Sequence, residues 1–428
     1  MSTTMADMLT AVELQTKALE DYRTAVLPGV VESIRHDAQA LRDARVLHVN
    51  ATAFGGGVAE ILASMVPLMR DLGMAADWKV LSGTDPFFSV TKAMHNALQG
   101  KAHPWTAAER NLWVETNREN AQGWEDYDFV VIHDPQPAPM LGLLREKGGT
   151  PAGKWLWRCH IDLTDAQPEA WDLLRPFVSE YDGTIWTMRE YVREGVAADN
   201  LFIAPPAIDP LSPKNVELPP GEAARVLDRF AVDAARPMVC QVSRFDPWKD
   251  PLGVIDAYRM ARERHPGLQL VLVGSLAHDD PEGQEWLQKV FDHRDHDRDI
   301  HVLTNLDGVG NHEVNAIQQA AKVVIQKSTR EGFGLVVSEG LWKGRPVIGG
   351  NCGGIPLQVR DGETGYLVES AEECGERLID LLDDEASCER MGAAGRELVR
   401  ERFLLTRYLH DYVRMFRTLA GLRPSERD

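Results

Sequence analysis

The sequence contains few cysteines and a deficit of basic residues. The five cysteines are scattered, odd in number and without a CxxC pair, which argues against a disulfide framework and a cysteine-based zinc site. Lys and Arg number 46 against 65 Asp and Glu, and the formal net charge is −19. Such an acidic chain lacks the basic surface on which sequence-independent nucleic-acid binding depends. We therefore expect buried free thiols and no nucleic-acid partner.

Long hydrophobic runs are also missing. No stretch of about 18 uncharged apolar residues occurs, so no transmembrane helix is predicted. Residues 1–26 carry acidic residues early and lack the continuous apolar core of a signal peptide. The sequence thus predicts a cytoplasmic protein without a membrane partner.

What the sequence does contain is a repeated alternation of short apolar runs and longer stretches of helical period. Many of the runs are almost continuously apolar, as in parallel strands that helices cover on both faces. The predicted strands are Val46–Asn50, Trp78–Leu81, Phe129–His133, Lys154–Arg158, Gly183–Thr187, Leu201–Ala204, Met238–Val242, Leu268–Val273, Ile300–Leu303, Val323–Gln326, Pro346–Gly349 and Gly365–Val368. The pattern occurs twice, which predicts an α/β fold of two doubly wound, Rossmann-like domains facing a central cleft.

The domain boundaries follow from composition. A proline-rich stretch within 205–236 is typical of a linker. We expect an N-terminal domain over 1–220, a second domain over 221–404 and a terminal segment over 405–428. That segment begins with an amphipathic helix, Leu405–Leu422, which we expect to cross back to the N-terminal domain. Ligands of doubly wound sheets bind outside the carboxyl ends of the strands, so the motifs at those ends are the candidate sites.

A glycine triplet, Gly55, Gly56 and Gly57, follows strand Val46–Asn50 and precedes a predicted helix. Glycines let the backbone approach a ligand closely, and a helix N-terminus attracts anions. A tight turn between strand and helix is an equally good interpretation of the triplet.

Two cations, Arg244 and Lys249, follow strand Met238–Val242. A planar guanidinium and a compact ammonium suit the two phosphates of a diphosphate. The alternative is a surface ion pair with Asp246 or Asp250.

The most informative motif is Glu331-Gly-Phe-Gly334 with Glu339 eight residues after Glu331. Its glycines allow backbone N–H groups to face a ligand. Carboxylates accept hydrogen bonds from vicinal hydroxyls, so the pair suits a sugar and a ribose. Alternatively, the two glutamates stabilise a helix N-terminus.

Four weaker patterns lie in other loops. His160 lies where it could bond a substrate hydroxyl, although a lone histidine is more often structural. Asp134 and Gln136 could hold hydroxyls or belong to a turn. Gly353-Gly354 forms a glycine-rich strand exit that packing alone could require. Asp279-Asp280 could be a metal-binding pair or a helix cap.

Together these motifs resemble the retaining glycosyltransferases of GT-B architecture in the sucrose-synthase-like family four, and nearly the whole chain is similar to its trehalose-forming subgroup. The resemblance is carried by HVNATAFGGGVAEIL (48–62), FFSVTKAMHNALQG (87–100), HDPQPAP (133–139), WLWRCHIDL (155–163), PPAIDPLSPKNVEL (205–218), VSRFDPWKD (242–250), VGSLAHDDPEG (273–283), REGFGL (330–335) and WKGRPVIGG (342–350). One departure is the run Gly353-Gly-Ile-Pro-Leu-Gln358, where the wider family usually has an acid.

The resemblance implies a reversible glucosyltransferase that makes trehalose from a nucleoside-diphosphate glucose and free glucose. It assigns the catalytic roles to His160, Arg244, Lys249 and Glu331. It assigns donor binding to Gly56, Arg244, Lys249, Glu331, the backbone of Gly332, Phe333, Gly334 and Leu335, and Glu339 at the ribose. Leu306, which follows a strand, is a candidate contact for the base, and Asp134 and Gln136 are candidates for the acceptor.

Other expectations concern partners and competing functions. We expect no tightly bound cofactor and no protein ligands for a metal, with magnesium acting only alongside the nucleotide as a stimulator. A homodimer is compatible with the sequence, which does not determine the oligomeric state. A phosphorylase of the same fold that uses glucose phosphate is the nearest alternative. A nicotinamide oxidoreductase lacks support because no GxGxxG follows the first strand, and a non-catalytic sugar-binding module is the third alternative.

Overall fold

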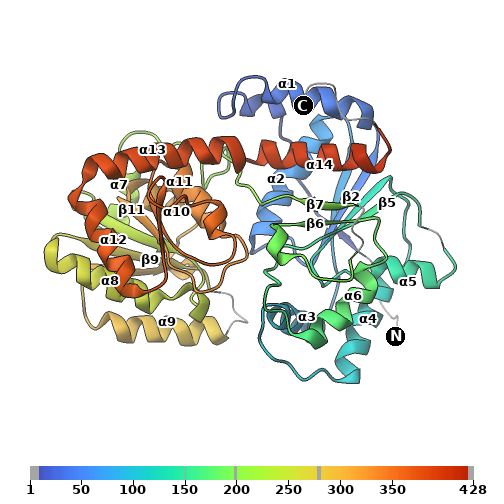
Figure 1. Cartoon of the computed structure of the whole chain (residues 1–428), viewed down its shortest axis with the longest axis horizontal. Coiled ribbons are helices and arrows are strands. Elements are labelled where there is room, and N and C mark those ends of the chain that lie inside the picture. The colour runs from blue at the N-terminus through green and yellow to red at the C-terminus, as the bar shows by residue number, and fades with distance from the viewer. Residues whose placement is uncertain (1–8, 150, 197–199, 277–280, 423–428) are drawn as a thin grey trace. The chain divides into compact units, whose positions relative to one another are not determined.

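The computed structural model describes residues 9–149, 151–196, 200–276 and 281–422. The chain forms two compact units (Figure 1). Unit 1 comprises the chain up to Pro206 together with the segment from Leu405 onward, and unit 2 comprises Ala207–Leu404. Asp279 and Asp280 lie outside the described residues.

Unit 1 is built on a sheet whose strand order is β1-β3-β2-β4-β5-β6-β7. Only β1 runs antiparallel to its neighbour, and the other described pairs are parallel. The strands are β1 (Thr10–Ala11), β2 (Arg45–Asn50), β3 (Ala75–Val80), β4 (Phe129–His133), β5 (Lys154–Arg158), β6 (Gly183–Trp186) and β7 (Leu201–Ile203). β4 is buried throughout, as a parallel strand covered on both faces should be.

Helices cover both faces of this sheet (Figure 1). α1 (Val30–Ala38), α2 (Gly57–Asp71) and α14 (Leu405–Leu419) pack together on one face. On the other face lie α3 (Asp85–Leu98), α4 (Ala107–Asn120), α5 (Met140–Glu146) and α6 (Pro168–Val178). Short 3₁₀ turns are η1 (Leu19–Tyr22), η2 (Gln39–Leu41) and η3 (Arg189–Tyr191).

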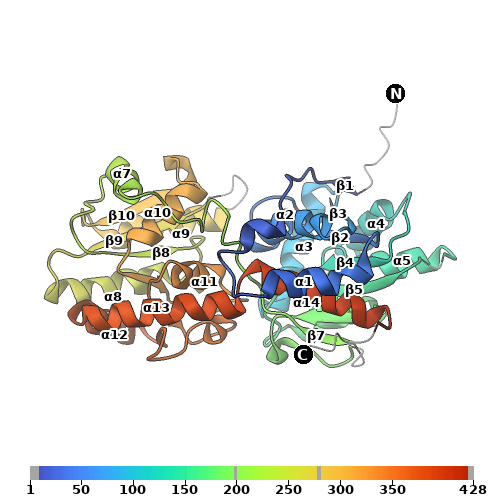
Figure 2. The same ribbon diagram turned by 90° about the horizontal axis from the view of Figure 1, so that it is seen from above.

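The C-terminal helix α14 belongs to unit 1 although it follows unit 2 in the chain. In both views it runs beside α1 (Figures 1 and 2). Its apolar face is buried, and Phe416 stacks on Phe129 of β4 with ring centroids 4.5 Å apart. Asp37 of α1, 2% exposed, accepts from His410 Nε2 at 2.7 Å. Apolar contact and a buried polar contact therefore hold α14 against α1 and β4.

Unit 2 has a wholly parallel sheet of strand order β10-β9-β8-β11-β12-β13. Its strands are β8 (Met238–Val242), β9 (Gln269–Gly274), β10 (Ile300–Thr304), β11 (Val323–Gln326), β12 (Val347–Gly350) and β13 (Gly365–Val368). α8 (Pro251–Arg264), α9 (Pro281–Arg294) and α12 (Ala371–Asp383) pack together, as do α7 (Glu222–Arg229), α10 (Asn311–Ala320) and α11 (Leu335–Trp342). α13 (Glu385–Arg402) packs on α11 and α12, and 3₁₀ turns are η4 (Pro247–Lys249), η5 (Asn305–Asp307) and η6 (Ile355–Leu357).

The predicted α/β class with two parallel-sheet domains is confirmed. Every predicted strand corresponds to an observed one, although β3 begins three residues early and β1 was not predicted. The proline-rich stretch is not a free linker, because it begins unit 2 and is held there. Asn315 Nδ2 donates to the carbonyls of Pro213 and Val216 at 3.1 and 2.7 Å. Among the described residues, no helix combines the length and the apolar character that crossing a membrane would require.

Candidate active site

Two of the predicted catalytic residues meet in unit 2. β8 and β11 are neighbours in the sheet, so the loops that follow them lie side by side. Lys249 Nζ is 2.6 Å from Glu331 Oε2, and their side chains are only 15% and 11% exposed. Gln326 Nε2 and Ser328 Oγ lie 3.3 Å from the same oxygen. The carboxylate of Glu331 is therefore held in place by one cation and two neutral hydrogen-bonding groups.

Arg244, the second predicted phosphate ligand, points to the surface. Its side chain is 57% exposed, and Nη2 lies 3.1 Å from Asp246 Oδ2. This is the ion pair weighed above as the alternative. Asp246 also accepts from the backbone N–H groups of Trp248 and Lys249, and so shapes the turn η4 that carries Lys249. Burial raises the pKa of the Asp246 carboxyl.

The loop between Glu331 and α11 presents a helix N-terminus. Gly334 has φ +80°, a conformation that favours glycine, and immediately precedes α11. The fully buried Gln358 donates from Nε2 to the carbonyls of Phe333 at 2.5 Å and Gly334 at 3.3 Å. It accepts from Ser338 Oγ at 2.5 Å. One amide thus fixes the peptide planes of the loop and ties them to the helix that follows.

Glu339 lies inside α11 and is 1% exposed. α11 begins at Leu335, so Glu331 stands before the helix and Glu339 within it, and the two do not share a helical face. Lys214 Nζ is 3.4 Å from Glu339 Oε1, and Gln318 Nε2 is 3.3 Å from Oε2. The carboxylate of Glu339 therefore already accepts from donors of the protein itself.

Leu306 lies in η5, directly after β10, and is 72% exposed. The side chain of Asn305 bonds both the N–H and the carbonyl of Leu276 and so joins this turn to the loop after β9. An exposed leucine on a braced turn offers an apolar surface to a flat ligand.

Two glycines of the triplet in unit 1, Gly55 and Gly56, border open space. Gly55 has φ +77° and requires glycine for its backbone conformation. Gly56 is extended, and a Cβ added to either residue would contact nothing within 4 Å. Packing therefore does not explain Gly56, whereas the approach of a ligand to the uncapped start of α2 would. The opposite holds for Gly354, whose added Cβ would stand 2.7 Å from Phe333 Cα, so packing accounts for that glycine.

Asp134 and His160 are brought together at the ends of β4 and β5. Asp134 has φ +64°, and its Oδ1 accepts from the backbone N–H of His160 at 2.7 Å. Burial raises the pKa of Asp134 to about 7 and lowers that of His160 well below its usual value. The side chain of Gln136 is partly exposed, while its carbonyl accepts from Trp113 and Asn117.

Several residues that support these sites carry no sequence signal of their role. Lys214 and Gln358 fall inside quoted motifs, but no spacing indicated that they contact Glu339 and the glycine loop. His48 and His133 were also not predicted as site residues, although His133 directly precedes Asp134. Each is buried in a strand, where a histidine looks like part of the core.

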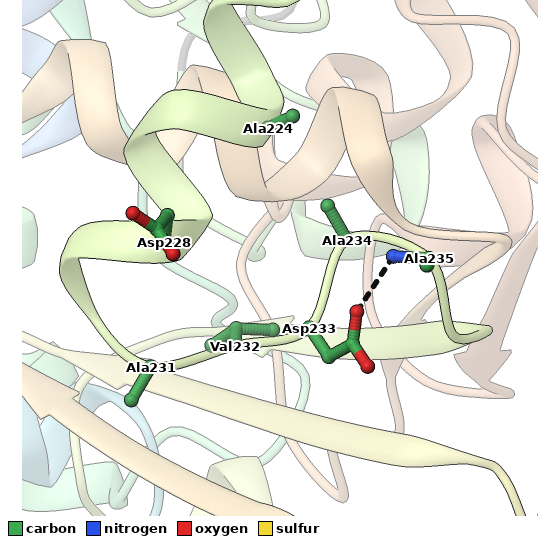
Figure 3. A pocket seen from close by; sticks show the side chains of 7 residues that line it. All are labelled: Ala224, Asp228, Ala231, Val232, Asp233, Ala234 and Ala235. Carbon is green, nitrogen blue, oxygen red and sulfur yellow. Dashed lines mark hydrogen bonds between the residues drawn. The ribbon is translucent and has the colours of Figure 1, made fainter.

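A surface hollow of about 420 Å³ lies elsewhere in unit 2 (Figure 3). It is lined by α7 and the segment that leads into β8, including Asp228 and Asp233. It therefore lies at the amino end of β8 and contains none of the predicted site residues. Within the described residues, no group of three or more His, Cys, Asp or Glu side chains is arranged to hold a metal ion.

Comparison with known proteins identifies both units. Residues 48–193 match the family described as trehalose synthase, N-terminal domain, and residues 227–398 match glycosyl transferases group 1. The trehalose synthase of Rubrobacter xylanophilus is 49% identical over 421 residues, which cover 97% of this chain and 100% of that protein. A trehalose phosphorylase of Pleurotus pulmonarius is 28% identical over 90% of this chain and 58% of its own length.

Solved structures agree in fold. An α,α-trehalose 6-phosphate synthase of Burkholderia multivorans superposes with a TM-score of 0.71 at 15% identity, over 89% of this chain and 99% of that one. The fold is therefore GT-B, and the expectation of a glycosyltransferase is confirmed. The chain belongs to the trehalose synthase family of glycosyltransferases.

Proposed function

We propose that the protein makes trehalose from a nucleoside-diphosphate glucose and free glucose, reversibly and with retention at the anomeric carbon. The observation that carries the proposal is the convergence of Lys249, Glu331 and the N-terminus of α11 at neighbouring strand ends of unit 2. A cation and a helix N-terminus attract phosphate, and a fixed carboxylate accepts from sugar hydroxyls. The 49% identity with a trehalose synthase supports the choice of sugar.

The donor contacts follow from this arrangement. Lys249 binds the diphosphate, and Arg244 reaches it by rotating its exposed side chain away from Asp246. Glu331 and the backbone of 332–335 hold the donor glucose and phosphates. Glu339 binds the ribose, for which its hydrogen bonds with Lys214 and Gln318 must rearrange. Leu306 contacts the base.

The acceptor contacts are proposed for unit 1. Asp134 keeps one carboxylate oxygen on the His160 backbone, which leaves Oδ2 to accept from a glucose hydroxyl. Gln136 offers its side-chain amide to a second hydroxyl. Gly56 and the uncapped start of α2 offer backbone N–H groups to an anionic group of a bound substrate.

In the proposed transfer, the bond between glucose C1 and the phosphate oxygen breaks. The acceptor hydroxyl oxygen forms the new bond to C1 on the same face, and its proton passes to an oxygen of the leaving diphosphate. Lys249 stabilises the charge that develops there; removal of one such contact typically costs ~2.7–4 kcal/mol of barrier. No side-chain nucleophile is required, so trapping a covalent glucosyl–protein adduct would contradict this mechanism.

The test is a panel of nucleoside-diphosphate glucose donors incubated with free glucose, with products identified by chromatography and anomeric NMR. We expect α,α-trehalose and release of the nucleoside diphosphate. The phosphorylase alternative is favoured by the similarity to Pleurotus trehalose phosphorylase. It is tested by incubating trehalose with inorganic phosphate: release of glucose phosphate, together with no reaction of any nucleotide donor, would replace the proposal.

A further inference from the structure

Three histidines form a hydrogen-bonded row across unit 1. They come from neighbouring strands: His48 lies in β2, His133 ends β4 and His160 follows β5. His48 Nδ1 is 3.0 Å from His133 Nε2, and His133 Nδ1 is 3.0 Å from His160 Nε2. The ring planes of His133 and His160 differ by 16°, and the ring centroids are 5.3 Å apart. The row runs from the interior of the sheet to the predicted catalytic histidine.

Burial favours the neutral form of all three imidazoles. Burial lowers the pKa of His48 to about 3 and those of His133 and His160 well below the usual value, and the buried guanidinium of Arg158 lowers the latter two further. A neutral imidazole has one N–H donor and one nitrogen acceptor. Because His133 bonds through both nitrogens, it donates on one side and accepts on the other. The two hydrogen bonds must therefore point in the same direction along the row.

The inner end of the row decides that direction. His48 is fully buried, and its Nε2 has no hydrogen-bond partner. If the row donated inward, from His160 towards His48, His48 Nε2 would carry a buried N–H group without an acceptor. If the row donates outward, from His48 towards His160, His48 Nε2 is an acceptor without a donor. Orphaned buried donors are rarer than under-satisfied acceptors, so His48 Nδ1–H donates to His133 and His133 Nδ1–H donates to His160.

The outer end then has a defined chemistry. His160 Nε2 accepts, so its hydrogen lies on Nδ1. The ring is partly exposed, and in the part of the chain that the structure describes Nδ1 has no hydrogen-bond partner. Asp134 Oδ1 accepts a hydrogen bond of 2.7 Å from the backbone N–H of His160 and so fixes the backbone that carries the imidazole ring. His160 thus presents a donor and not a base.

We propose that His48 and His133 are positioning residues that fix the tautomer of His160, so that its Nδ1–H donates to a hydroxyl oxygen of a bound sugar. The choice of a sugar rests on the proposed function, whereas the tautomer does not.

The test exchanges the donor at the inner end of the row, which is hydrogen-bonded to His133 and not to His160. His48→Asn keeps an amide N–H near the place of Nδ1. His48→Met has a similar size but offers His133 only a weak sulfur acceptor, which favours an N–H on His133 Nε2 and reverses the row. His301→Met is the control, because His301 also has a buried Nε2 without a partner but lies in β10 of unit 2.

The first measurement is ¹⁵N NMR of the imidazoles in the full chain without substrate. We expect His160 to be protonated at Nδ1 in the wild type, in H48N and in H301M, and to shift towards Nε2 protonation in H48M. A bare Nδ1 or a doubly protonated ring in the wild type would overturn the inference, whatever reaction the protein catalyses.

The second measurement is kinetic. We expect H48M to lower kcat/KM for the sugar substrates roughly tenfold, less than the ~10²–10³ in kcat that full loss of one transition-state donor costs. H48N should stay within about twofold, and nucleoside-diphosphate affinity should be unchanged in both. Equal losses in H48M and H48N, with the tautomer unaltered, would reduce His48 to a packing role and refute the proposal. A correct tautomer without trehalose synthesis would refute the proposed function alone.

Discussion

The buried pair of Lys249 and Glu331 allows stability and catalysis to be separated. Lys249→Met removes the ammonium and keeps an unbranched side chain of similar length. Glu331 then loses its cation but keeps the hydrogen bonds of Gln326 and Ser328. Breaking a buried pair typically costs ~3–5 kcal/mol, and these hydrogen bonds place the expected loss at the lower end, about 3 kcal/mol. For a unit of this size, the thermal midpoint of unit 2 should fall by about 6–12 °C.

The double variant Lys249→Met/Glu331→Gln removes both charges together. It should recover most of the thermal midpoint, because no uncompensated charge stays buried. It should not recover turnover, because the cation that we propose to stabilise the leaving diphosphate is still absent; we expect kcat to stay lower by roughly 10²–10³. Calorimetry and initial rates with the active nucleotide donor measure the two effects on the same samples.

Lys322→Met is the control for loss of a lysine charge. Lys322 pairs with Glu385 at 2.7 Å, but the two side chains are 44% and 72% exposed, and exposed pairs contribute ~0–1 kcal/mol. Its midpoint and rate should both stay near those of the wild type. Recovery of activity as well as stability in the double variant would show that Lys249 serves only to hold Glu331, and would refute its role at the diphosphate.

Three further changes test other parts of the molecule. Glu339→Gln should weaken nucleoside-diphosphate binding even without sugar, and wild-type affinity in titration calorimetry would remove Glu339 from the donor site. Asp134→Asn should remove the contribution of this carboxyl to the pH dependence of stability. Because the pKa of Asp134 is about 7 in the folded state and about 3.9 when unfolded, the folded state binds more protons between these values. The stability of the wild type relative to D134N should therefore decline as pH rises from about 4 to about 7. Thermal melts of both proteins across that range measure this difference, and a constant difference would contradict a raised pKa. Asp37→Asn should destabilise the docking of α14 by ~1–3 kcal/mol through its contact with His410, and an unchanged denaturant midpoint would show that apolar contacts alone hold the helix.

Much of the architecture could be read from local patterns. Strand β4, Phe129–His133, is a continuous apolar run, and its predicted bounds are those observed. Helix α8 begins at Pro251, directly after its cap Asp250, and buries Val254, Ile255, Tyr258 and Ala261 at helical spacing. These elements obey rules of short range, in which the period of hydrophobicity and the identity of a capping residue decide the outcome.

Contacts across the sheets could not be read in this way. Arg244 and Lys249 look equivalent as cations after β8, yet one pairs at the surface with Asp246 and the other is buried against Glu331, 82 residues away in the chain. Gln358 ends the run 353–358 in which the wider family usually has an acid, and only its hydrogen bonds to the carbonyls of 333 and 334 show what the amide does.

By itself, the sequence determined the α/β class, the strands and the chemical types of residue that follow them, because these depend on periodicity and on neighbours along the chain. The tertiary structure alone decided which of those residues touch. The row of His48, His133 and His160 exists only because parallel pairing sets three strands side by side in a fixed register, in which each histidine lies two residues beyond the partner of the one before. The histidines are separated by 85 and 27 residues along the chain. Hydrogen bonding and burial act through space, and distance along the chain does not encode them.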